Sequence, residues 1–421
     1  MRPFHVVIGG GGFGGLTAAK TLGKEIQKRK LPCKLTLIDK ENHHLFQPLL
    51  YQVATAGLAA TDIAVPIRSI LSRIQEVEVR METIERIDLE KKMLFCSKGV
   101  LSYDFLILSL GMRVNYFGHE EWSSFCLGLK TLGDGRSIRN VILNAFEKAE
   151  IETNPKEREK YMTFVIVGGG PTGVELAGAL AELSKKALKK DFRNIDPANT
   201  RIILLEAAPR ILLSYNERLS ALARSRLEKM GVEIMVSKPV EKIEKGKIFY
   251  KGGMIEASTI LWAAGVCAMD LPGLDVPKVK DGRIKVLEDL TVPGHPEIFV
   301  IGDMAMVPGV PAVAPAAIQM GKYAAYEISR RVACQVGRRT GRDFLKPRAF
   351  HYFDKGMMTT LGRGKAIVQF HNFGFNGYLA WIVWLLVHII TLISFRNRLT
   401  VLIQWAWAYF RFKPGARLLS K

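Results

Sequence analysis

Two clusters of glycine residues, each set between an apolar run and a helical pattern, are the parts of this chain whose types and spacing point to chemistry. One cluster is Gly168-x-Gly170-x-x-Gly173, preceded by FVIV and followed by VELAGALAEL. In such a strand, turn and helix, the first glycine makes the turn, the second admits a pyrophosphate, and the third lets the helix pack on the strand. The phosphates bind at the helix N-terminus, where free N–H groups stabilise anions. We therefore predict a dinucleotide site here.

The other cluster lies near the start of the chain and has the same spacing, Gly10-x-Gly12-x-x-Gly15. It follows one predicted strand, and a second predicted strand over residues 34–38 ends at Asp39. An acid in this place accepts hydrogen bonds from the ribose hydroxyls of a dinucleotide. The 24 residues that separate it from the third glycine are close to the expected spacing. The sequence thus predicts a second dinucleotide site.

The later nucleotide unit also has an acid at the end of its second strand, where residues 201–205 lead to Glu206. A carboxylate at this point accepts from the ribose of NADH and repels the 2′-phosphate of NADPH, so we expect NADH to be preferred, with nearby Arg210 opposing. Farther on, the apolar run EIFVIG ends at Asp303. This acid is placed to bind a second phosphate or a ribitol hydroxyl of the cofactor held by the earlier cluster.

Length and composition are those of a globular protein of two or three domains, with 421 residues, 48% hydrophobic and 24% charged. The five cysteines stand singly, so neither a disulfide framework nor a local dithiol centre is predicted, and a reducing compartment is expected. No metal site is predicted. Because a strand begins within a few residues of Met1, we expect no signal or transit peptide.

The formal charge of +20 is concentrated at the end of the chain. Residues 331–421 hold 15 Lys and Arg against two Asp, and residues 366–395 within them contain no Lys, Arg, Asp or Glu. Basic residues beside apolar aromatic segments are typical of a membrane surface, where each contributes ~1 kcal/mol, and not of a nucleic-acid groove. We expect an anionic membrane surface as a partner and no nucleic acid. The alternative is a solvated basic face over a buried helix.

The apolar tail over residues 378–395 is 18 residues long, close to the ~20 that a membrane-spanning helix needs. His388, Thr391 and Ser394 nevertheless form a weak polar stripe, and the next helix is one-sided too. Basic residues rim the pair: Arg396, Arg398, Arg411 and Lys413. Two one-sided helices favour a position in the membrane interface over a span.

Several segments, in order, closely resemble the type II NADH dehydrogenases, single-subunit flavoenzymes of respiratory membranes that do not pump protons. The segments are VVIGGGGFGG, HLFQPLLYQVATA, FVIVGGGPTGVELAG, LLEAAPRIL, LWAAGV, IFVIGD, AIQMG, and FDKGMMTTLGRGKA followed by WIVWLLVHIITLISFRNRL. The resemblance implies an α/β, glutathione-reductase-like fold of two Rossmann-like dinucleotide-binding domains with a C-terminal amphipathic membrane-binding helical segment. The expected domains are 1–120 and 271–342 for FAD, 121–270 for NADH, and 343–421 for the C-terminal domain.

The resemblance also implies roles for individual residues. FAD is expected to be held by Gly10, Gly12, Gly15, Asp39 and Asp303, and NADH by Gly168, Gly170, Gly173 and Glu206. The quinone site is expected to use Gln47, Pro48, Tyr51 and Gln319. Lys355 is expected to stabilise the anionic reduced flavin, the alternative being a solvated turn lysine. The sequences SLG at residues 109–111 and APAA at residues 314–317 depart from the ATG and AQ-x-A patterns that are frequent in the family.

Together these features predict an FAD-dependent oxidoreductase that transfers a hydride from NADH to FAD and then two electrons to a membrane quinone. Glu175 follows the second cluster by two residues, on the first turn of the predicted helix. A carboxylate in such a dry site is expected to have a raised pKa and to relay a proton or orient the nicotinamide. The alternative is a favourable interaction with the helix dipole alone. We thus predict Glu175, Lys355 and Gln319 as catalytic residues.

The expected location is the cytoplasmic side of the cell inner membrane, with the protein peripheral to it. Three other functions are compatible with parts of the sequence: a sulfide:quinone reductase, a soluble NADH-dependent flavoprotein reductase, and a basic nucleotide-sensing binding protein without enzymatic activity. The complete second glycine cluster argues against the first of these, and the apolar tail argues against the second. The sequence leaves open which quinone is used and whether the chain forms a homodimer.

Overall fold

The computed structural model describes residues 2–337, 348–411 and 416–419, with the side chains of residues 408–411 left aside. The chain divides into two compact units, each assembled from separated stretches of sequence. Unit 1 contains Met1–His44, Val65–Arg113 and Val266–Lys355, and unit 2 contains Leu45–Ala64, Val114–Gly265 and Gly356–Lys421. Short strands stand at the points of the sequence where the chain changes unit: β3 (His43–Leu45), β4 (Ala64–Pro66), β10 (Met112–Val114) and β19 (Val266–Ala268).

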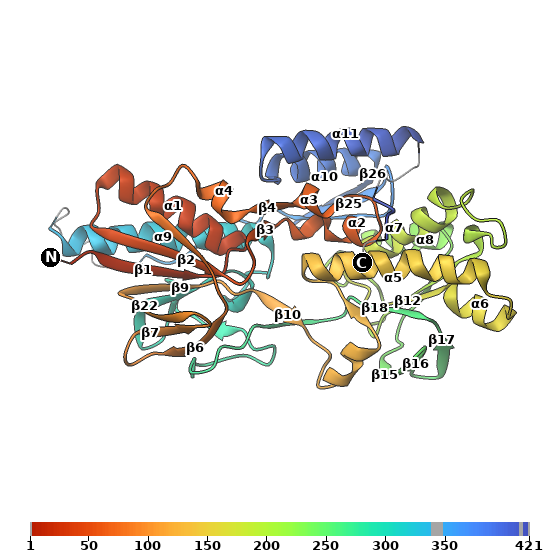
Figure 1. Ribbon diagram of the computed structural model, residues 1–421, viewed down its shortest axis with the longest axis horizontal. Helices are drawn as coiled ribbons and strands as arrows, with labels where there is room; N and C mark the ends of the chain where they lie inside the picture. Colours follow the sequence, from red (N-terminus) through yellow and green to blue (C-terminus); the bar gives the residue numbers. More distant parts are fainter. Residues whose placement is uncertain (1, 338–347, 412–415, 420–421) are drawn as a thin grey trace. The chain divides into compact units, whose positions relative to one another are not determined.

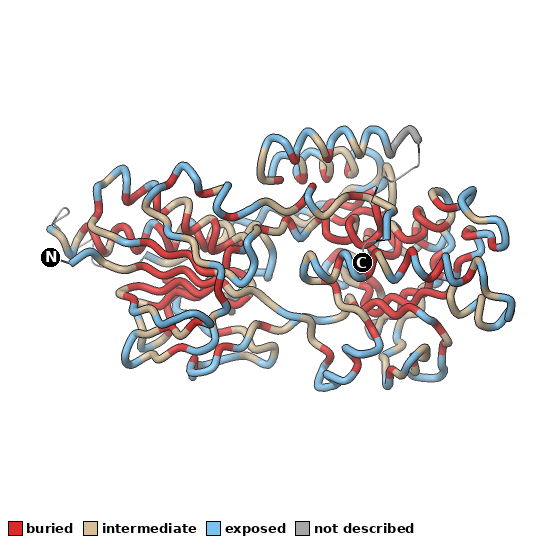
Figure 2. Tube along the Cα trace, in the orientation of Figure 1, coloured by how far each residue is buried: buried red, intermediate tan, exposed pale blue. Residues whose placement is uncertain are grey.

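The core of unit 1 is a six-stranded sheet with the strand order β21-β22-β9-β1-β2-β5. Its strands, in that order, are Thr291–Val292, His295–Val300, Phe105–Leu108, Phe4–Gly9, Cys33–Asp39 and Val77–Met81. Neighbouring strands are parallel except for β21 and β22. The central strands are mainly apolar, and they are buried except for the first two residues of β1 (Figure 2), as expected for a parallel sheet that is covered on both faces.

Helices α1 (Phe13–Arg29) and α9 (Ala314–Gln335) pack together on one face of this sheet, and the antiparallel strands β6, β7 and β8 lie against the other face (Figure 1). The two helices approach closely, because a Cβ atom on Gly321 would lie 2.3 Å from the carbonyl oxygen of Gly14. This contact places the start of α9 beside the first glycine cluster. The remaining elements of unit 1 are β6 (Ile84–Asp88), β7 (Met93–Cys96), β8 (Gly99–Ser102), α4 (Ile67–Leu71), β20 (Ile284–Lys285), β23 (Ala305–Met306) and a 3-10 turn, η5 (Gly302–Met304).

Unit 2 is built on a five-stranded parallel sheet with the order β11-β18-β12-β13-β14. Its strands, in that order, are Leu127–Gly128, Thr259–Trp262, Thr163–Val167, Arg201–Leu205 and Val232–Met235. The helices of the same unit include α5 (Leu132–Ile151), α6 (Pro155–Tyr161), α7 (Pro171–Glu182) and α8 (Glu217–Lys229), with shorter turns η2 (Glu120–Ser124), η3 (Leu183–Ala187) and η4 (Pro197–Asn199). The parallel strands are buried here too (Figure 2).

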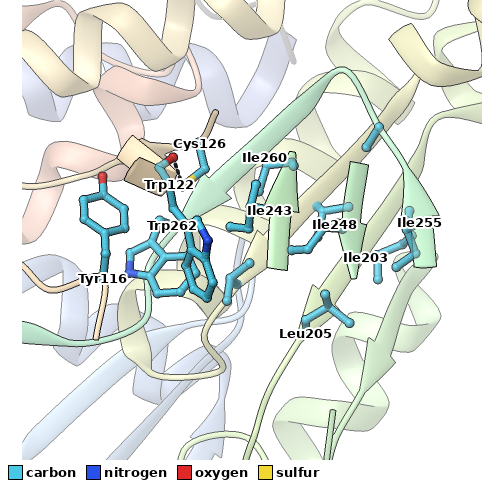
Figure 3. Packing of buried hydrophobic residues seen from close by; sticks show 13 residues of the cluster. Tyr116, Trp122, Cys126, Ile203, Leu205, Ile243, Ile248, Ile255, Ile260 and Trp262 are labelled. Carbon is cyan, nitrogen blue, oxygen red and sulfur yellow. Dashed lines mark hydrogen bonds between the residues drawn. The ribbon is translucent and has the colours of Figure 1, made fainter. Parts of the chain in front are cut away.

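A three-stranded antiparallel sheet, β15 (Val240–Glu244), β16 (Lys247–Tyr250) and β17 (Gly253–Glu256), packs on the parallel sheet of unit 2. Figure 3 shows its isoleucines, Ile243, Ile248 and Ile255, facing apolar side chains of the parallel strands. Trp262 extends this cluster and packs against Trp122 at a ring distance of 5.5 Å. The apolar area removed from water in this cluster, at ~25 cal/mol per Å², stabilises the contact between the two sheets.

The rest of unit 2 comes from two other stretches of the chain, Leu45–Ala64 and Gly356–Lys421. Residues 45–64 form η1 (Gln47–Leu49), α2 (Leu50–Ala54) and α3 (Ala60–Ile63). The end of the chain forms an antiparallel sheet of β24 (Met357–Thr360), β25 (Ala366–Phe370) and β26 (Phe373–Gly377), followed by α10 (Tyr378–Thr391) and α11 (Phe395–Arg411). Helix α10 packs on this sheet and contacts α11 (Figure 1).

Residues 350–368 of the sequence predict two short strands about a turn at Lys355 and Gly356, and the polar run over residues 136–159 predicts an exposed spacer helix. The structure differs from both predictions. The first hairpin near the end of the chain does not turn at Lys355 and Gly356; strands β24 and β25 turn over residues 361–365 instead. Gly356 and Gly362 both have positive φ, 75° and 79°, and of these two residues it is Gly362 that lies in the hairpin turn. In the predicted spacer, α5 buries one face that includes Ile142 and Phe146, whereas α6 has no buried residue, so the prediction is wrong for α5.

The two units repeat one another. Each runs from a strand through a helix to a second strand, then to a third strand, through three antiparallel strands, and back into the parallel sheet. The resulting strand orders, β9-β1-β2-β5 and β18-β12-β13-β14, are equivalent. This confirms the predicted α/β fold with two Rossmann-like dinucleotide-binding domains, and it places each glycine cluster between the first strand and first helix of its unit.

Candidate active site

The first glycine loop, residues 10–15, has a backbone that only glycine fits at two points. Gly10 has a φ of 98°, and a Cβ atom there would lie 2.2 Å from the carbonyl oxygen of Ser109. A Cβ atom on Gly15 would lie 1.8 Å from the carbonyl oxygen of Gly10. Gly12 differs, because a Cβ atom there meets no described atom within 4 Å. The loop is therefore closed by protein on one side and open at Gly12, where the backbone can approach a ligand.

The second glycine loop, residues 168–173, has the same construction. Gly168 has a φ of 107°, and a Cβ atom on Gly173 would lie 1.9 Å from its carbonyl oxygen. At Gly170 an added Cβ again meets no described atom within 4 Å. In both loops the second glycine is the N-cap of the following helix, α1 or α7, and its side chain position is empty. Both loops thus present a helix N-terminus suited to a phosphate.

The acid at the end of the second strand is hydrogen-bonded to the loop in both units. Asp39 Oδ2 accepts from the N–H of Gly11 at 2.5 Å, and Glu206 Oε2 accepts from the N–H of Gly169 at 2.5 Å. The other oxygen of each carboxylate accepts a second backbone N–H, from Glu41 and from Ala208. A carboxylate has about four acceptor positions, so lone pairs remain for ribose hydroxyls. Burial raises the pKa of Asp39. The sequence placed both acids correctly but did not indicate these bonds.

Arg210, the basic residue near Glu206 in the sequence, forms hydrogen bonds with the backbone. Arg210 donates to three backbone carbonyl oxygens, those of Leu212, Leu213 and Tyr215. Its guanidinium group therefore closes the turn that follows the second strand of unit 2.

Ser109, at the position where the sequence departs from the family pattern, contacts the first loop directly. Its Oγ accepts from the N–H of Gly15 at 3.1 Å. The side chain of Ile301 approaches the same region, 3.2 Å from where a Gly14 Cβ would lie. Asp303 follows two residues later on η5. The carboxyl end of β22 thus brings Asp303 to the side of unit 1 that carries the first glycine loop.

Unit 2 contains a cavity of ≈ 140 Å³ beside helix α7. Its walls combine carboxylates and hydroxyls with tryptophan rings. The lining residues include Tyr51, Gln52, Glu175, Glu182, Thr360, Trp384 and Trp405. A volume of this size is close to the ~150 Å³ that accommodates one benzene ring.

Glu175 lies in the second turn of α7, not the first, and its partly exposed side chain lines this cavity. Protein surrounds the rest of its carboxyl group, and burial raises the pKa of Glu175 to about 8, although a hydrogen bond from the Thr360 N–H, 3.3 Å from Oε1, opposes the shift. At neutral pH the group is therefore mainly protonated, so it can donate as well as accept a proton. Burial also raises the pKa of Tyr51.

A sequence of hydrogen bonds leads from α11 to Glu175. Trp405 Nε1 donates to Gln52 Oε1 at 2.8 Å, and Gln52 Nε2 donates to the Tyr51 hydroxyl at 3.0 Å. The Tyr51 hydroxyl in turn lies 3.0 Å from Thr360 Oγ1, a hydrogen bond in which either oxygen can be the donor. The Thr360 N–H then donates to Glu175. Thr360 contacts Tyr51 through its hydroxyl and Glu175 through its backbone N–H, so these bonds connect α11 to Glu175 residue by residue.

The other predicted quinone residues do not line the cavity. Gln47 is exposed and its Nε2 donates to the carbonyl oxygen of Lys130. Pro48 occupies the first turn of η1. In unit 1, the amide of Gln319 forms two hydrogen bonds of 2.9 Å with the backbone N–H and carbonyl of Phe353, two residues before the exposed Lys355. Of the predicted quinone residues, the structure thus brings Tyr51 together with Glu175.

The last two helices differ in part from the predicted pattern. Helix α10 ends at Thr391, so Ser394 is not in it, and His388 is buried against Trp384 with its pKa lowered to about 4 by burial. Among the residues that the structure describes, no helix is both long enough and apolar enough to cross a membrane. Both helices nevertheless expose large apolar side chains, which include Leu379, Leu386, Ile390, Leu399, Leu402, Ile403 and Trp407. Lys413 and the Arg411 side chain lie outside the described residues.

Comparison with known proteins agrees with this geometry. The model of the pyridine nucleotide-disulphide oxidoreductase family matches residues 4–321. Two curated proteins of Mycobacterium tuberculosis are similar over nearly the whole chain: type II NADH:quinone oxidoreductase NdhA is 42% identical, covering 99% of this chain and 89% of its own length, and type II NADH:quinone oxidoreductase Ndh is 39% identical, covering 98% and 90%. The chain belongs to the type II NADH:quinone oxidoreductases. The sequence resemblance to this family is thereby confirmed.

The fold is shared with a solved member as well. The structure of NDH2 from Plasmodium falciparum in complex with NADH superposes with a TM-score of 0.85 at 19% identity, covering 100% of both chains. Sequence reasoning about this type II NADH:quinone oxidoreductase missed Ser109, Gln52, Thr360 and Trp405. Thr360 lies in the segment FDKGMMTTLGRGKA that carries part of the resemblance, but neither its type nor its spacing distinguishes it from its neighbours.

Proposed function

We propose that this chain carries out the reaction of its family, the oxidation of NADH and the reduction of a quinone through bound FAD. The observation that carries this proposal is the duplication of one glycine loop, complete with its strand-end carboxylate, in the two units. Two dinucleotides are needed for such a reaction, one retained and one exchanged. Family membership favours this reaction over sulfide oxidation, over a soluble reductase, and over nucleotide binding without catalysis.

FAD is assigned to unit 1. The open side of Gly12 at the N-terminus of α1 fits a pyrophosphate, and the acceptor positions left on Asp39 fit ribose hydroxyls. Gly10 and Gly15 maintain the turn and the close contact of helix and strand, and Asp303 supplies a further carboxylate on the same side of the unit. When bound, the flavin takes two electrons from NADH and passes them to the quinone.

NADH is assigned to the second loop, with Gly168, Gly170 and Gly173 in the corresponding roles. Glu206 accepts from the ribose hydroxyls and repels a 2′-phosphate. Because Arg210 is committed to three carbonyl oxygens, its guanidinium group is not aligned to pair with a 2′-phosphate. This arrangement supports NADH over NADPH.

Glu175 is assigned the role of a proton donor and acceptor for quinone reduction, which consumes protons. Three observations support this role: the carboxyl faces a cavity, burial raises its pKa to about 8, and Tyr51 and Thr360 form the adjoining wall. The helix-dipole alternative has less support, because the macrodipole acts within the first turn and Glu175 lies beyond it. Tyr51 contributes a hydroxyl that is fixed on both sides.

Gln319 and Lys355 are assigned to the flavin side of the reaction. The two hydrogen bonds between Gln319 and Phe353 fix the segment that leads to Lys355. A lysine at this position would supply a positive charge that stabilises the negative charge developing on the reduced flavin. Gln47 and Pro48 are proposed to form the outer part of the quinone path.

We assign the exposed apolar side chains of α10 and α11, with Arg396 and Arg398, to a docking surface for an anionic membrane. Apolar area and ~1 kcal/mol per basic residue combine in such binding. The protein is then peripheral, on the cytoplasmic side of the inner membrane, where quinone is available. Release of the protein from membranes by high salt or alkaline carbonate supports this assignment, and retention under both treatments contradicts it.

The proposed reaction is tested by mixing the purified flavoprotein with NADH and a soluble short-chain quinone while NADH absorbance is recorded. We expect NADH to be consumed continuously, beyond one equivalent per flavin, only with quinone present, and NADPH to be a much poorer donor. Bleaching of the flavin by NADH without quinone-dependent turnover indicates a binding protein instead. Quinone reduction driven by sulfide rather than NADH contradicts the proposed donor.

A further inference from the structure

His44, which neither the predicted site nor the proposed reaction uses, contacts the backbone of the first glycine loop. It lies in β3, is 2% exposed, and its Nδ1 is 3.0 Å from the carbonyl oxygen of Gly11. A carbonyl oxygen only accepts, so Nδ1 carries the proton and donates. Its Nε2 is buried and has no hydrogen-bond partner among the residues that the structure describes. The contact with Gly11 is thus the polar interaction that explains a histidine here.

The bond to Gly11 also determines the direction of the next N–H group. The Gly11 carbonyl and the Gly12 N–H belong to one peptide unit, and in a planar trans peptide they point in opposite directions. The Gly12 N–H is therefore aimed away from His44. At Gly12 an added Cβ meets no described atom within 4 Å, so this residue borders the open part of the loop. On its other side the same segment is held by the bond from the Gly11 N–H to Asp39.

The second loop provides an independent comparison within the same chain. There the equivalent carbonyl oxygen, that of Gly169, accepts from the backbone N–H of Leu212 at 2.7 Å, and the Gly169 N–H donates to Glu206. Leu212 has a φ of 51°, an unfavourable conformation for leucine that the surrounding bonds maintain. Both loops thus hold the corresponding glycine through its N–H and through its carbonyl oxygen. The donor is a side chain in one loop and main chain in the other.

We propose that His44 is a positioning residue for FAD. Its hydrogen bond fixes the peptide unit between Gly11 and Gly12 so that the Gly12 N–H points at the pyrophosphate. The inference rests on the proposed assignment of FAD to unit 1. Without the imidazole donor, the Gly11 carbonyl loses its partner and the peptide unit is free to rotate. Binding of FAD must then restrict that rotation, and the free-energy cost of this ordering weakens binding.

The test measures FAD affinity for three forms of the full chain after the flavin has been removed. His44→Leu removes the donor, and His44→Asn places an amide nitrogen at nearly the same distance from Cα as the imidazole Nδ1. We expect the FAD Kd of the Leu variant to rise ~10-fold, the factor that corresponds to one hydrogen bond of ~1.4 kcal/mol, and the Asn variant to recover most of the wild-type affinity. Flavin fluorescence during titration reports the binding.

Two controls separate positioning from general damage. His43→Leu alters the neighbouring histidine, whose Nδ1 faces the Asn42 side chain, and its FAD Kd should not change. At saturating FAD, the KM for NADH of the His44→Leu variant should equal that of the wild type, because Leu212 holds the second loop. Equal FAD affinities of the Leu variant and the wild type, or of the Leu and Asn variants, overturn the inference. Absence of FAD binding by the wild type overturns the assignment of unit 1 as well.

Discussion

Replacing Glu175 with glutamine is expected to remove the pH dependence of quinone reduction and to lower its rate, while leaving flavin reduction by NADH intact. Glutamine keeps the size of the side chain and an acceptor for the Thr360 N–H, but it cannot release a proton. A positioned general acid contributes roughly 10²-fold or more to a rate. We therefore expect kcat with quinone to fall by about two orders of magnitude at neutral pH.

The pH profile follows from the pKa of Glu175, which is about 8. A group with this pKa is protonated in about 90% of molecules at pH 7 and in about 10% at pH 9. If the protonated form donates, kcat of the wild type falls about tenfold between these pH values, whereas kcat of the Glu175→Gln variant does not.

Stability gives a second readout of the same group. A glutamate that titrates near 4.3 in the unfolded chain and near 8 in the folded one favours folding fully below pH 4.3, and this contribution is lost as pH rises to about 8. The slope is at most ~1.4 kcal/mol per pH unit, and less here because the side chain meets the cavity. Denaturant unfolding at pH 5 and pH 7.5 should therefore show a loss in the wild type that the glutamine variant lacks.

The assay compares a soluble quinone with ferricyanide, an acceptor that takes electrons without protons. Glu182→Gln is the matched control, since Glu182 lines the same cavity on the same helix and accepts from the Arg363 N–H. We expect Glu175→Gln to slow quinone reduction alone and Glu182→Gln to slow neither reaction. A wild-type kcat that stays constant from pH 6 to beyond 9, or equal effects of Glu175→Gln on both acceptors, refutes the proton-donor role.

Four further predictions follow from the two loops, the cavity and the surface helices. Glu206→Gln should raise the KM for NADH and reduce discrimination against NADPH; unchanged kinetics with both nucleotides would contradict the assignment. Compared without flavin, Gly12→Ala and Gly170→Ala should both keep the wild-type melting temperature, because neither added Cβ meets a described atom within 4 Å, yet the first should lose FAD binding and the second should only raise the KM for NADH. Tyr51→Phe should lower the free energy of unfolding by ~1 kcal/mol, measured in denaturant, because it removes a buried hydroxyl that bonds Gln52 and Thr360. Arg396→Gln should weaken binding to anionic vesicles by about fivefold, the effect of ~1 kcal/mol, and should not change binding to neutral vesicles.

The parts of the site that the sequence predicted well are local. The glycine spacing specifies a turn whose geometry depends on six residues, and the acids Asp39 and Glu206 follow at the ends of adjacent strands. Both are consequences of one strand, turn and helix, so no distant contact had to be known. Membership of the family was predicted from short motifs spread over the chain and is confirmed by relatives of 39% and 42% identity.

The parts that could not be predicted depend on long-range packing. The Tyr51 hydroxyl meets Thr360 across 309 residues of sequence, and nothing in the local pattern of either segment selects that partner. The polar stripe expected on the last apolar helix fails for a related reason. His388 was expected on a solvated face, but stacking on Trp384 and a hydrogen bond to its carbonyl oxygen hold it in the interior. Composition does not distinguish a buried histidine from an exposed one.

The two loops differ in how readily mutation can change them. A point mutation such as His44→Leu removes the side-chain donor that holds the first loop, whereas no substitution by a residue other than proline removes the main-chain N–H of Leu212 that holds the second. Selection can therefore adjust the retention of the flavin by point mutation at this position. The loop for the nucleotide that binds and leaves at every turnover is protected from the same kind of change.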